Sequence, residues 1–313
     1  MPKKSTNDNN VITIDINRLA NIRVQLIVAL ATVILLGASV LWWQKVNTTP
    51  KRVFEAMLRR NLTTASITKK VSSGSDGQKL DQYVQLSFAA EQPIARSLVV
   101  YEQKTQEGPN SLVKTETLGT NTADYSRYVQ IETDQKNQQG KALDFSGVRD
   151  VWGKLDKNED AAQVQNLQSA VFGLVPFARL DASLSDKFAR QLIESKAYSV
   201  DYSQAKSTTV NGRAVWQYTV KINVAEYLKV LQKVSQLVGV RDTSALNAND
   251  YQNQPPVEVT MSVEKGSRQL LILDTGSGGQ KEEYSAYGIT LPIQLPTNVV
   301  PQAELQQKLQ DIR

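Results

Sequence analysis

The stretch that decides the fold is VNGRAVWQYTVKINVAEYLKVLQKVSQLVG, residues 210 to 239. Its Asn211-Gly212 dipeptide predicts a tight hairpin turn, because both residue types tolerate a positive φ angle. Apolar side chains then alternate along the second strand, which places these on one side: Trp216, Tyr218, Val220 and Ile222. The alternation predicts an antiparallel hairpin whose second strand has one buried face.

The same stretch passes without interruption into a helix. Asn223 and Glu226 match the start of a capping box, and Gly239 matches a helix stop. Between them, apolar side chains recur at helical spacing: Val224, Tyr227, Leu228, Leu231 and Val238. We expect an amphipathic helix that lies with its apolar side on the sheet.

Further periodic runs lie on both sides of this stretch. They predict strands within residues 82–88, 95–104, 111–119, 124–133, 197–210, 257–266, 268–274 and 280–296. Helical spacing predicts helices within residues 50–61, 158–171, 183–195 and 301–313, with Ser183 and Asp186 opening the third. Short consecutive strands pair most simply as an antiparallel meander. The order predicts an α+β domain with one large antiparallel sheet and helices across one face.

Composition excludes much of enzyme chemistry. The chain has no cysteine and no histidine, which removes disulfides, thiolate or imidazole metal ligands, and every Ser-His or Cys-His catalytic arrangement. The net charge of +5 comes from scattered Lys and Arg, without a basic run of the kind that binds nucleic acid. Asp156, Glu159 and Asp160 lack the ligand spacing of a calcium loop. We therefore expect no catalytic residue, no cofactor, no metal site and no nucleic-acid partner.

One segment departs from this polar composition. Residues 24–43, VQLIVALATVILLGASVLWW, carry no charge, and as a helix they would be about 30 Å long, enough to cross the hydrocarbon layer of a membrane. Trp42 and Trp43 would then lie at one interface. A buried helix would show a polar stripe, and a cleaved signal peptide would have a shorter apolar region. The segment predicts an uncleaved transmembrane anchor.

The anchor orders the rest of the chain. Basic residues lie on both sides of it, so the orientation follows from size, because long polar domains translocate largely regardless of charge. We expect a single-pass cell-membrane protein with a cytoplasmic N-terminus and an extracytoplasmic C-terminal domain. The predicted segments are a tail at 1–23, the anchor at 24–43, a linker at 44–50, the domain at 51–300 and a C-terminal tail at 301–313.

Asp274-Thr275-Gly276-Ser277 follows an apolar strand, as the catalytic Asp of an aspartic protease does. Such an enzyme needs two carboxylates that share a proton, and this chain has a single Asp-Thr-Gly. A half-size enzyme that dimerises would need more chain after the motif than follows here. We interpret Asp274 and Thr275 as caps of a turn in which Gly276, Gly278 and Gly279 supply positive φ angles.

Two stretches resemble a known family. VNGRAVWQYTVKINVAEYLKVL, residues 210–231, resembles the hairpin and following helix of LppX/LprG-type lipoproteins, which share the LolA-type lipoprotein-carrier fold. YSAYGITLPIQLP, Tyr284 to Pro296, resembles the closing segment of those domains. The likeness extends over about residues 50 to 300 in element order. It implies a curved, unclosed antiparallel half-barrel, covered on its concave face by helices.

In that bacterial envelope family the space between sheet and helices holds acyl chains. The resemblance implies a non-enzymatic domain that binds an amphiphile, such as a lipid, a glycolipid or lipoprotein acyl chains. The implied lining residues are Leu86, Phe88, Trp216, Tyr218, Val220, Tyr227, Leu228, Leu231, Val259 and Met261. Members of the family are usually soluble or cysteine-acylated. An anchor at 24–43 instead favours capture, presentation or handover beside the membrane.

The same apolar residues also describe a closed core. In that case the domain is an interaction or sensory module that recognises an envelope protein through its surface. Sequence does not separate a filled cavity from a packed one, so both interpretations remain open at this level.

Overall fold

The computed structural model describes residues 47–75, 77–89, 92–104, 108–156, 166–240, 247–276, 280–289 and 292–312. The predicted anchor at 24–43 lies outside these ranges, as does the tail at 1–23. Within them, no helix is both long and apolar enough to cross a membrane. The chain divides after Thr49, and the unit Pro50–Arg313 is described below.

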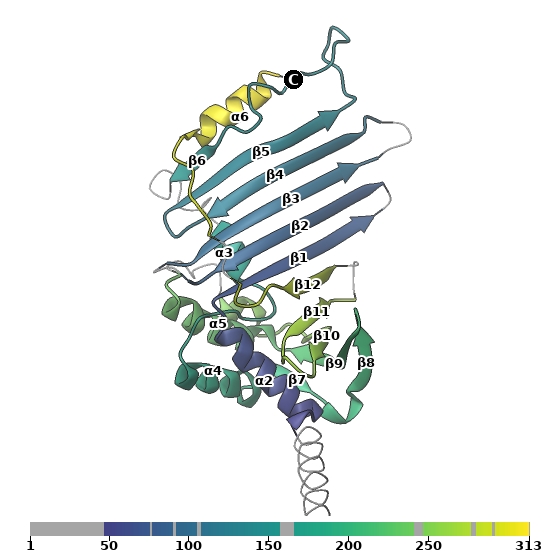
Figure 1. Cartoon of the computed structure of the whole chain (residues 1–313), viewed down its shortest axis with the longest axis vertical. Coiled ribbons are helices and arrows are strands. Elements are labelled where there is room, and N and C mark those ends of the chain that lie inside the picture. Colours follow the sequence, from purple (N-terminus) through teal and green to yellow (C-terminus); the bar gives the residue numbers. More distant parts are fainter. Residues whose placement is uncertain are drawn as a thin grey trace, which may run out of the picture. The chain divides into compact units, whose positions relative to one another are not determined.

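One large sheet organises this unit (Figure 1). Its strands are β1 (Ser66–Ser75), β2 (Gln78–Ser87), β3 (Ile94–Gln103), β4 (Ser111–Gly119), β5 (Ala123–Thr133), β6 (Gly153–Asp156), β7 (Tyr198–Val200), β8 (Lys206–Val210), β9 (Arg213–Ile222), β10 (Val257–Glu264), β11 (Leu270–Asp274), β12 (Lys281–Ser285) and β13 (Val300–Pro301). The strand order is β13-β6-β5-β4-β3-β2-β1-β12-β11-β10-β9-β7, and β8 pairs with β9. All pairs are antiparallel except β13 with β6. The structure confirms the expected combination of helices with one large, unclosed, mostly antiparallel sheet.

The pairing of β1 with β12 joins two meanders into this one sheet. β1 to β6 follow one another in space, as do β9 to β12, and the register Thr68↔Ser285 to Ser72↔Lys281 connects them. Sequence analysis missed β1, because Lys69 and Lys70 interrupt the alternation of its apolar residues. Hydrogen bonding to β2 on one side and β12 on the other holds the segment as a strand despite its composition.

The helices occupy only part of the sheet. They are α2 (Pro50–Leu62), α3 (Asn166–Val171), α4 (Ala182–Glu194), α5 (Val224–Leu237) and α6 (Gln302–Gln310), with short 3₁₀ turns η1 (Tyr202–Gln204) and η2 (Ala248–Tyr251). Figure 1 shows α2, α4 and α5 gathered at the β7–β12 end, while β1 to β5 extend away from them. Much of the long-stranded half therefore carries none of these three helices.

Most local predictions are confirmed in the structure. Asn211 and Gly212 turn the β8–β9 hairpin with φ angles of 48° and 75°. The Asn223 side chain caps α5 by accepting a hydrogen bond from the Glu226 N–H at 3.2 Å. The predicted helices at 50–61 and within 301–313 correspond to α2 and α6. Val164, on the predicted apolar face before α3, lies outside the described residues.

Three local predictions need correction. The helix α4 is capped by Asp181, whose carboxylate accepts from the Leu184 N–H at 2.8 Å, and Ser183 is already inside the helix. The predicted strand at 197–210 is interrupted by η1, so β7 and β8 are separate. The predicted strand at 280–296 ends at Ser285, because Ala286 and Gly288 adopt φ angles of 55° and 72° and turn the chain.

The core lies between the helices and one side of the sheet, which we call the helix face. Ile67, Leu86, Met261 and Tyr218 point to this side and belong to one buried apolar cluster. Phe54 of α2 meets the ring of Tyr218 edge-on, with centroids 5.2 Å apart. Aromatic and aliphatic side chains of both layers thus interlock, and the sheet holds α2, α4 and α5 by burial of apolar surface.

Gly119 at the end of β4 determines where α3 lies. A Cβ atom on Gly119 would be 2.4 Å from the backbone nitrogen of Leu167. That atom is part of the main chain, so it cannot move aside as a flexible side chain would. α3 therefore packs directly on the backbone of β4, and only glycine permits this approach.

We predict that Gly119→Ala displaces α3 and lowers the free energy of unfolding of the full chain by about 1–3 kcal/mol. Gly147→Ala is the matched control, because a Cβ there would meet no heavy atom within 4 Å. Pulse proteolysis in urea measures both. Equal stability of the two variants would show that α3 does not depend on this contact.

Candidate functional site

The implied lining residues all belong to the core in the structure. Nine of them are buried in the cluster between sheet and helices: Leu86, Phe88, Tyr218, Val220, Tyr227, Leu228, Leu231, Val259 and Met261. Trp216 is partly buried and packs against the cluster, with the Lys265 ammonium 4.0 Å from its ring centre. The structure brings the ten together, but as a packed core.

A small cavity remains between the helix face and the segment 170–177, which we call the lid. Its volume is about 10 Å³, whereas sites for small organic ligands measure about 300–1,000 Å³. The cavity is lined by Ile67, Lys69, Val84, Leu86, Ala170, Val171, Gly173, Val175, Phe177 and Tyr284. Of the implied lining residues, only Leu86 reaches it. This interface is therefore closed to an acyl chain in the described conformation.

Two buried tyrosines hold the lid in place. The Tyr227 hydroxyl of α5 donates to the Gly173 carbonyl at 2.6 Å, and the Tyr198 hydroxyl of β7 donates to the Leu174 carbonyl at 2.7 Å. Phe177 at the end of the lid stacks obliquely on Tyr284, with centroids 5.3 Å apart. The lid is therefore held by a contact from the helix α5 and by contacts from the strands β7 and β12.

An ionisable cluster borders the lid. The Lys69 ammonium lies 3.7 Å from Oε1 of Glu282, and both side chains are largely buried, at 14% and 10% exposure. The Tyr284 hydroxyl donates a hydrogen bond to the same carboxylate. Burial, followed by the Glu282 charge, raises the pKa of Tyr284 well above its ordinary value, so this hydroxyl remains a donor.

Beyond the lid, the helix face of β1 to β5 carries no charge over three successive rungs of the sheet. Directly opposite residues of an antiparallel pair share a face, so the register identifies the members of each rung. They are Val71, Gln82, Val99, Thr115 and Tyr128; Ser73, Leu80, Tyr101, Val113 and Ile131; and Gln78, Gln103, Ser111 and Thr133. We call this surface the uncharged platform. Its apolar members other than buried Val71 are half-buried.

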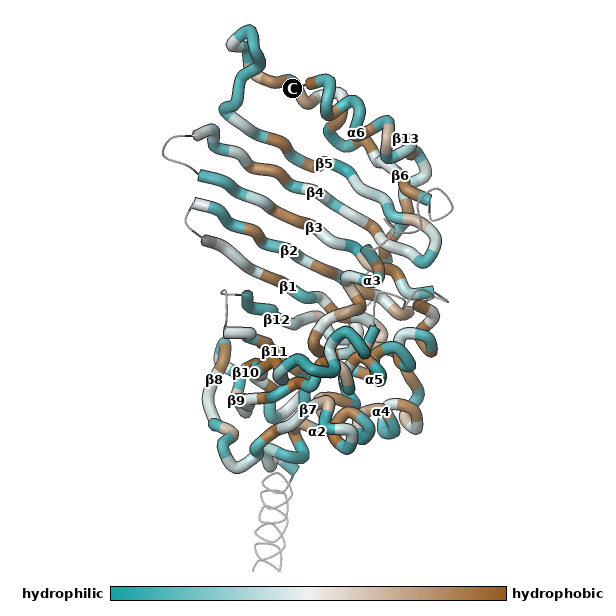
Figure 2. Tube along the Cα trace, turned by 180° about the vertical axis from the view of Figure 1, so that it is seen from behind, coloured by the Kyte–Doolittle hydropathy of each residue, from teal (hydrophilic) through white to brown (hydrophobic). Residues whose placement is uncertain are grey.

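The strands that form the platform are rich in hydrophobic residues. Hydrophobic stretches recur along β3, β4 and β5 in the half of the sheet away from α2, α4 and α5 (Figure 2). A soluble antiparallel sheet commonly buries its apolar face against a second layer. The described part of the chain provides that layer over β7–β12 but not over the platform.

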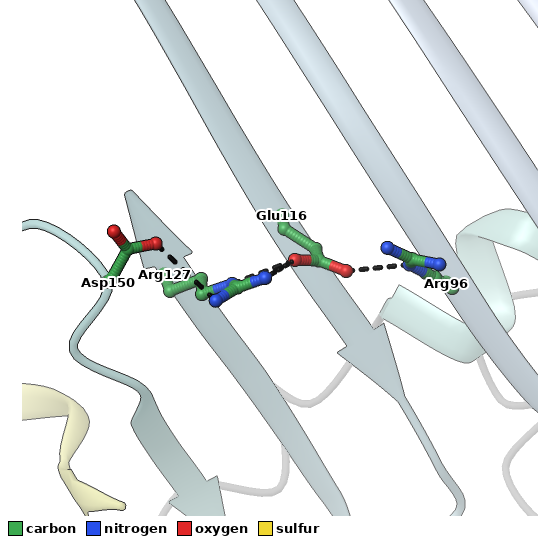
Figure 3. Close-up of polar contacts among 4 residues, drawn as sticks. All are labelled: Arg96, Glu116, Arg127 and Asp150. Atoms are coloured by element: carbon green, nitrogen blue, oxygen red, sulfur yellow. Dashed lines mark hydrogen bonds and ion pairs between the residues drawn. The ribbon is translucent and has the colours of Figure 1, made fainter. Parts of the chain in front are cut away.

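The opposite side of the same strands, the outer face, is charged. It carries Lys70, Lys79, Asp81, Arg96, Glu102, Lys114, Glu116, Arg127 and Glu132. Glu116, only 5% exposed, lies between two guanidinium groups: Arg96 Nε is 2.6 Å from one oxygen, and Arg127 Nε and Nη2 are 2.8 and 2.6 Å from the other (Figure 3). Asp150 extends the network, at 3.4 Å from Arg127 Nη1.

This network ties β3, β4 and β5 together on the outer face. The Arg127 guanidinium also lies 4.8 Å from the centre of the Trp152 ring. Trp152 and Ile293 in turn pack against the small second core of Leu118, Ala123 and Tyr125. The charges of this network are therefore paired, and the Arg127 guanidinium is also stacked on an aromatic ring.

Asp274 lies in a turn, as interpreted from the sequence. It ends β11, and its carboxylate accepts a hydrogen bond from the Gly276 N–H at 2.8 Å, while Gly276 has a φ angle of 67°. Thr275 Oγ1 donates to the Gln280 carbonyl at 3.2 Å. These are the local caps of a hairpin end. Gly278 and Gly279 lie outside the described residues.

Sequence reasoning missed the residues that border the platform. Lys69 and Glu282 are 213 positions apart (282 minus 69), and only the β1–β12 pairing makes them neighbours. In β3 the run Leu98-Val99-Val100 is apolar at every position, so alternation does not tell which residue faces the helices. The strand register assigns the faces instead. Ala95 of β3 is paired with Leu86 and Gly119, which lie on the helix face, and Val99 lies on the same side of β3 as Ala95.

The buried tyrosines predict an alkaline loss of stability. Burial is the first cause that raises the pKa of Tyr198, Tyr218, Tyr227, Tyr284 and Tyr287 above the ordinary 10.0. Above about pH 10 the unfolded chain releases these protons while the folded chain keeps them, so stability falls as pH rises. Without histidine or cysteine, we expect little change near neutrality.

Urea unfolding of the full chain at a series of pH values checks this. The control is Tyr227→Phe, which removes one buried phenol and should make the alkaline decline shallower while costing about 1 kcal/mol near neutral pH. Native-state tyrosinate absorbance that develops fully at about pH 10 would contradict the raised pKa values.

Searches against protein-family models and curated proteins find no match to this chain. Its function is therefore inferred from its own geometry. The features that bear on function are the closed cavity under the lid, the Lys69–Glu282 pair and the uncharged platform.

Proposed function

We propose that the unit Pro50–Arg313 is a non-enzymatic domain that binds an amphiphile, with the apolar chain of the ligand lying on the uncharged platform. In this proposal the sheet is a curved half-barrel, and the platform is the part of its concave face that the helices leave open. The observation that carries the proposal is the segregation of charge between the two faces of β1 to β5.

The segregation matters because both faces belong to the same strands. The outer face has charged side chains at most of its rungs, whereas the platform has Val, Leu, Ile and Tyr interspersed with uncharged polar residues. Covering apolar surface contributes roughly 25 cal/mol for each Å² removed from water. An acyl chain gains this contribution on the platform, and it would displace no ion pair there. The apolar side chains of the platform are half-buried, so a ligand chain laid on them would cover the part of their surface that still contacts water.

The closed core is compatible with binding if the lid moves. The lid is held by the hydroxyls of Tyr198 and Tyr227 and by the contact of Phe177 with Tyr284. Each of these two neutral hydrogen bonds contributes about 1 kcal/mol. A ligand that covers enough apolar surface to contribute more than this can offset the loss of both bonds. Movement of the lid would connect the platform to the cavity beside Leu86.

We propose that the chain acts at a membrane. The predicted anchor at 24–43 would keep the domain on the extracytoplasmic side, where a lipid, a glycolipid or the acyl chains of a lipoprotein are available. A tethered domain cannot carry its ligand far. Capture, presentation or handover beside the membrane fits such a tether better than transport across an envelope.

A second candidate is an interaction module that binds an envelope protein. The observation in its favour is the packed core, where the cavity under the lid measures about 10 Å³. A protein partner needs no internal cavity, because it can cover the platform from outside. In that case the platform is a protein interface and the lid remains shut.

Photo-crosslinking from the sheet distinguishes the two candidates. We predict that a benzophenone amino acid at Val99, on the platform, captures a lipid-sized adduct in the full chain expressed in cells. The same group at Val100, on the outer face of the same strand and similarly half-buried, should capture far less. Mass spectrometry of β3 peptides identifies the adducts.

The outcome at Val99 decides between the candidates. A covalent protein partner at Val99 would replace the amphiphile proposal with the interaction module. Equal lipid capture at Val99 and Val100 would mean that the charge segregation does not direct binding, and absence of any adduct at Val99 would count against both candidates.

A further inference from the structure

Lys69 is the one basic residue on the helix face of β1 to β5 among the residues that the structure describes. Its rung also contains Val84, Ser97, Thr117 and Ser126. That rung lies between the part of the sheet under α3 and the uncharged platform. A single cation thus stands where the covered and uncovered parts of the helix face meet.

The ion pair of Lys69 is loose for a buried group. Its 3.7 Å distance to Glu282 exceeds the 2.7–3.2 Å of an N–H···O hydrogen bond, whereas Lys281 and Glu283 on the outer face are 2.7 Å apart. An ammonium has three donors. Within the described part of the chain, the Lys69 ammonium donates no hydrogen bond. Desolvation of such a pair is repaid only by good geometry, which this pair lacks.

The surroundings of the ammonium suit an anion. Lys69 forms part of the wall of the cavity of about 10 Å³, and a Cβ atom on Gly173 of the lid would be 3.8 Å from the ammonium, so an anionic head group reaches Lys69 only when the lid moves. The remaining wall is apolar apart from the Tyr284 hydroxyl, which is engaged by Glu282. In such surroundings a charge-assisted hydrogen bond is stronger than in water.

We propose that Lys69 binds the anionic head group, a carboxylate or a phosphate, of the amphiphile whose chain lies on the platform. This inference rests on the proposed function and adds the class of ligand and its direction. The head group lies at the border of the lid, and the chain extends from Val71 and Val99 toward Tyr101 and Val113. Glu282 neutralises Lys69 in the absence of ligand and competes with the head group when ligand arrives.

The competition gives opposite predictions for the two partners of one ion pair. Lys69→Gln removes the cation and should lower binding of anionic amphiphiles about tenfold, the effect of one charge-assisted hydrogen bond. Glu282→Gln removes the competing anion and should raise it. A purely structural ion pair would not give changes of opposite sign, because loss of either partner would only destabilise the fold.

The test uses the full chain in phosphatidylcholine vesicles and three diazirine-labelled probes: palmitic acid, its methyl ester and a phosphatidic acid. We expect the acid and the phosphatidic acid to label β3 and β4 peptides more than the ester does. The ratio of the two anionic probes distinguishes a carboxylate ligand from a phosphate ligand. Lys69→Gln should abolish the preference for anions, and Lys69→Arg should retain it.

Lys70→Gln is the matched control, because Lys70 is the next residue of β1 and lies on the outer face, 5.5 Å from the Tyr83 ring centre. The Lys70→Gln variant should be labelled by the three probes to the same extent as the unchanged chain. Equal labelling by acid and ester in the unchanged chain would overturn the head-group inference and leave the proposed function intact. A lack of platform labelling by every probe would overturn both.

Folding of the variants is checked by urea unfolding. Should Lys69→Gln fail to fold, Glu282→Gln still decides, because the Tyr284 hydroxyl can donate to the amide oxygen of the new glutamine. Reduced labelling by anionic probes in folded Glu282→Gln would overturn the inference.

Discussion

The pairing of β1 with β12 is the constraint on which the rest of this structure depends. β1 is the first strand of the unit and β12 lies more than two hundred residues later, at Lys281–Ser285. Their hydrogen bonds turn two separate meanders into one sheet. The register also sets which side chains share a face, and a slip of one residue would move Lys69 from the helix face to the outer face.

This constraint explains why the two halves of the sheet differ. The helices α2, α4 and α5 cover the β7–β12 half. Their apolar side chains pack against Tyr218, Met261 and neighbouring residues of the sheet. The strands β1 to β5 extend beyond these helices, so part of the helix face carries none of the three. Gly119 allows α3 to pack on β4 at the boundary, and the lid begins in the last residues of α3. The boundary between covered and uncovered sheet is therefore where the lid, the cavity and the Lys69–Glu282 pair all lie.

The two faces of β1 to β5 also differ in charge. The outer face keeps its strands in register with paired charges, above all Glu116 between Arg96 and Arg127 (Figure 3). Glu116 is only 5% exposed, and its burial is offset by hydrogen bonds from the two guanidinium groups, whereas the platform carries no charge. On the helix face, Lys69 and Glu282 are both largely buried and form an ion pair with a distance of 3.7 Å. If the domain binds an amphiphile as proposed, the closed core is one of its conformations, and movement of the lid would connect the core to the platform.

Sequence alone determined the elements whose signals are local. The Asn211-Gly212 turn, the Asn223 cap of α5, the apolar face of α2 and the turn at Asp274 depend on residues within a few positions of one another, and each follows from backbone preference or side-chain spacing. The residues of the core were also recognisable, because alternation and helical spacing mark burial.

Tertiary structure decided what depends on partners distant in sequence. β1 is a strand through its neighbours, since Lys69 and Lys70 break its pattern. In β3, where Leu98, Val99 and Val100 are all apolar, only the pairing with β2 and β4 assigns a face. The platform, the lid and the ion pair of Lys69 exist because hydrogen bonds between strands fix the register, and a strand's own sequence does not contain its neighbour's register.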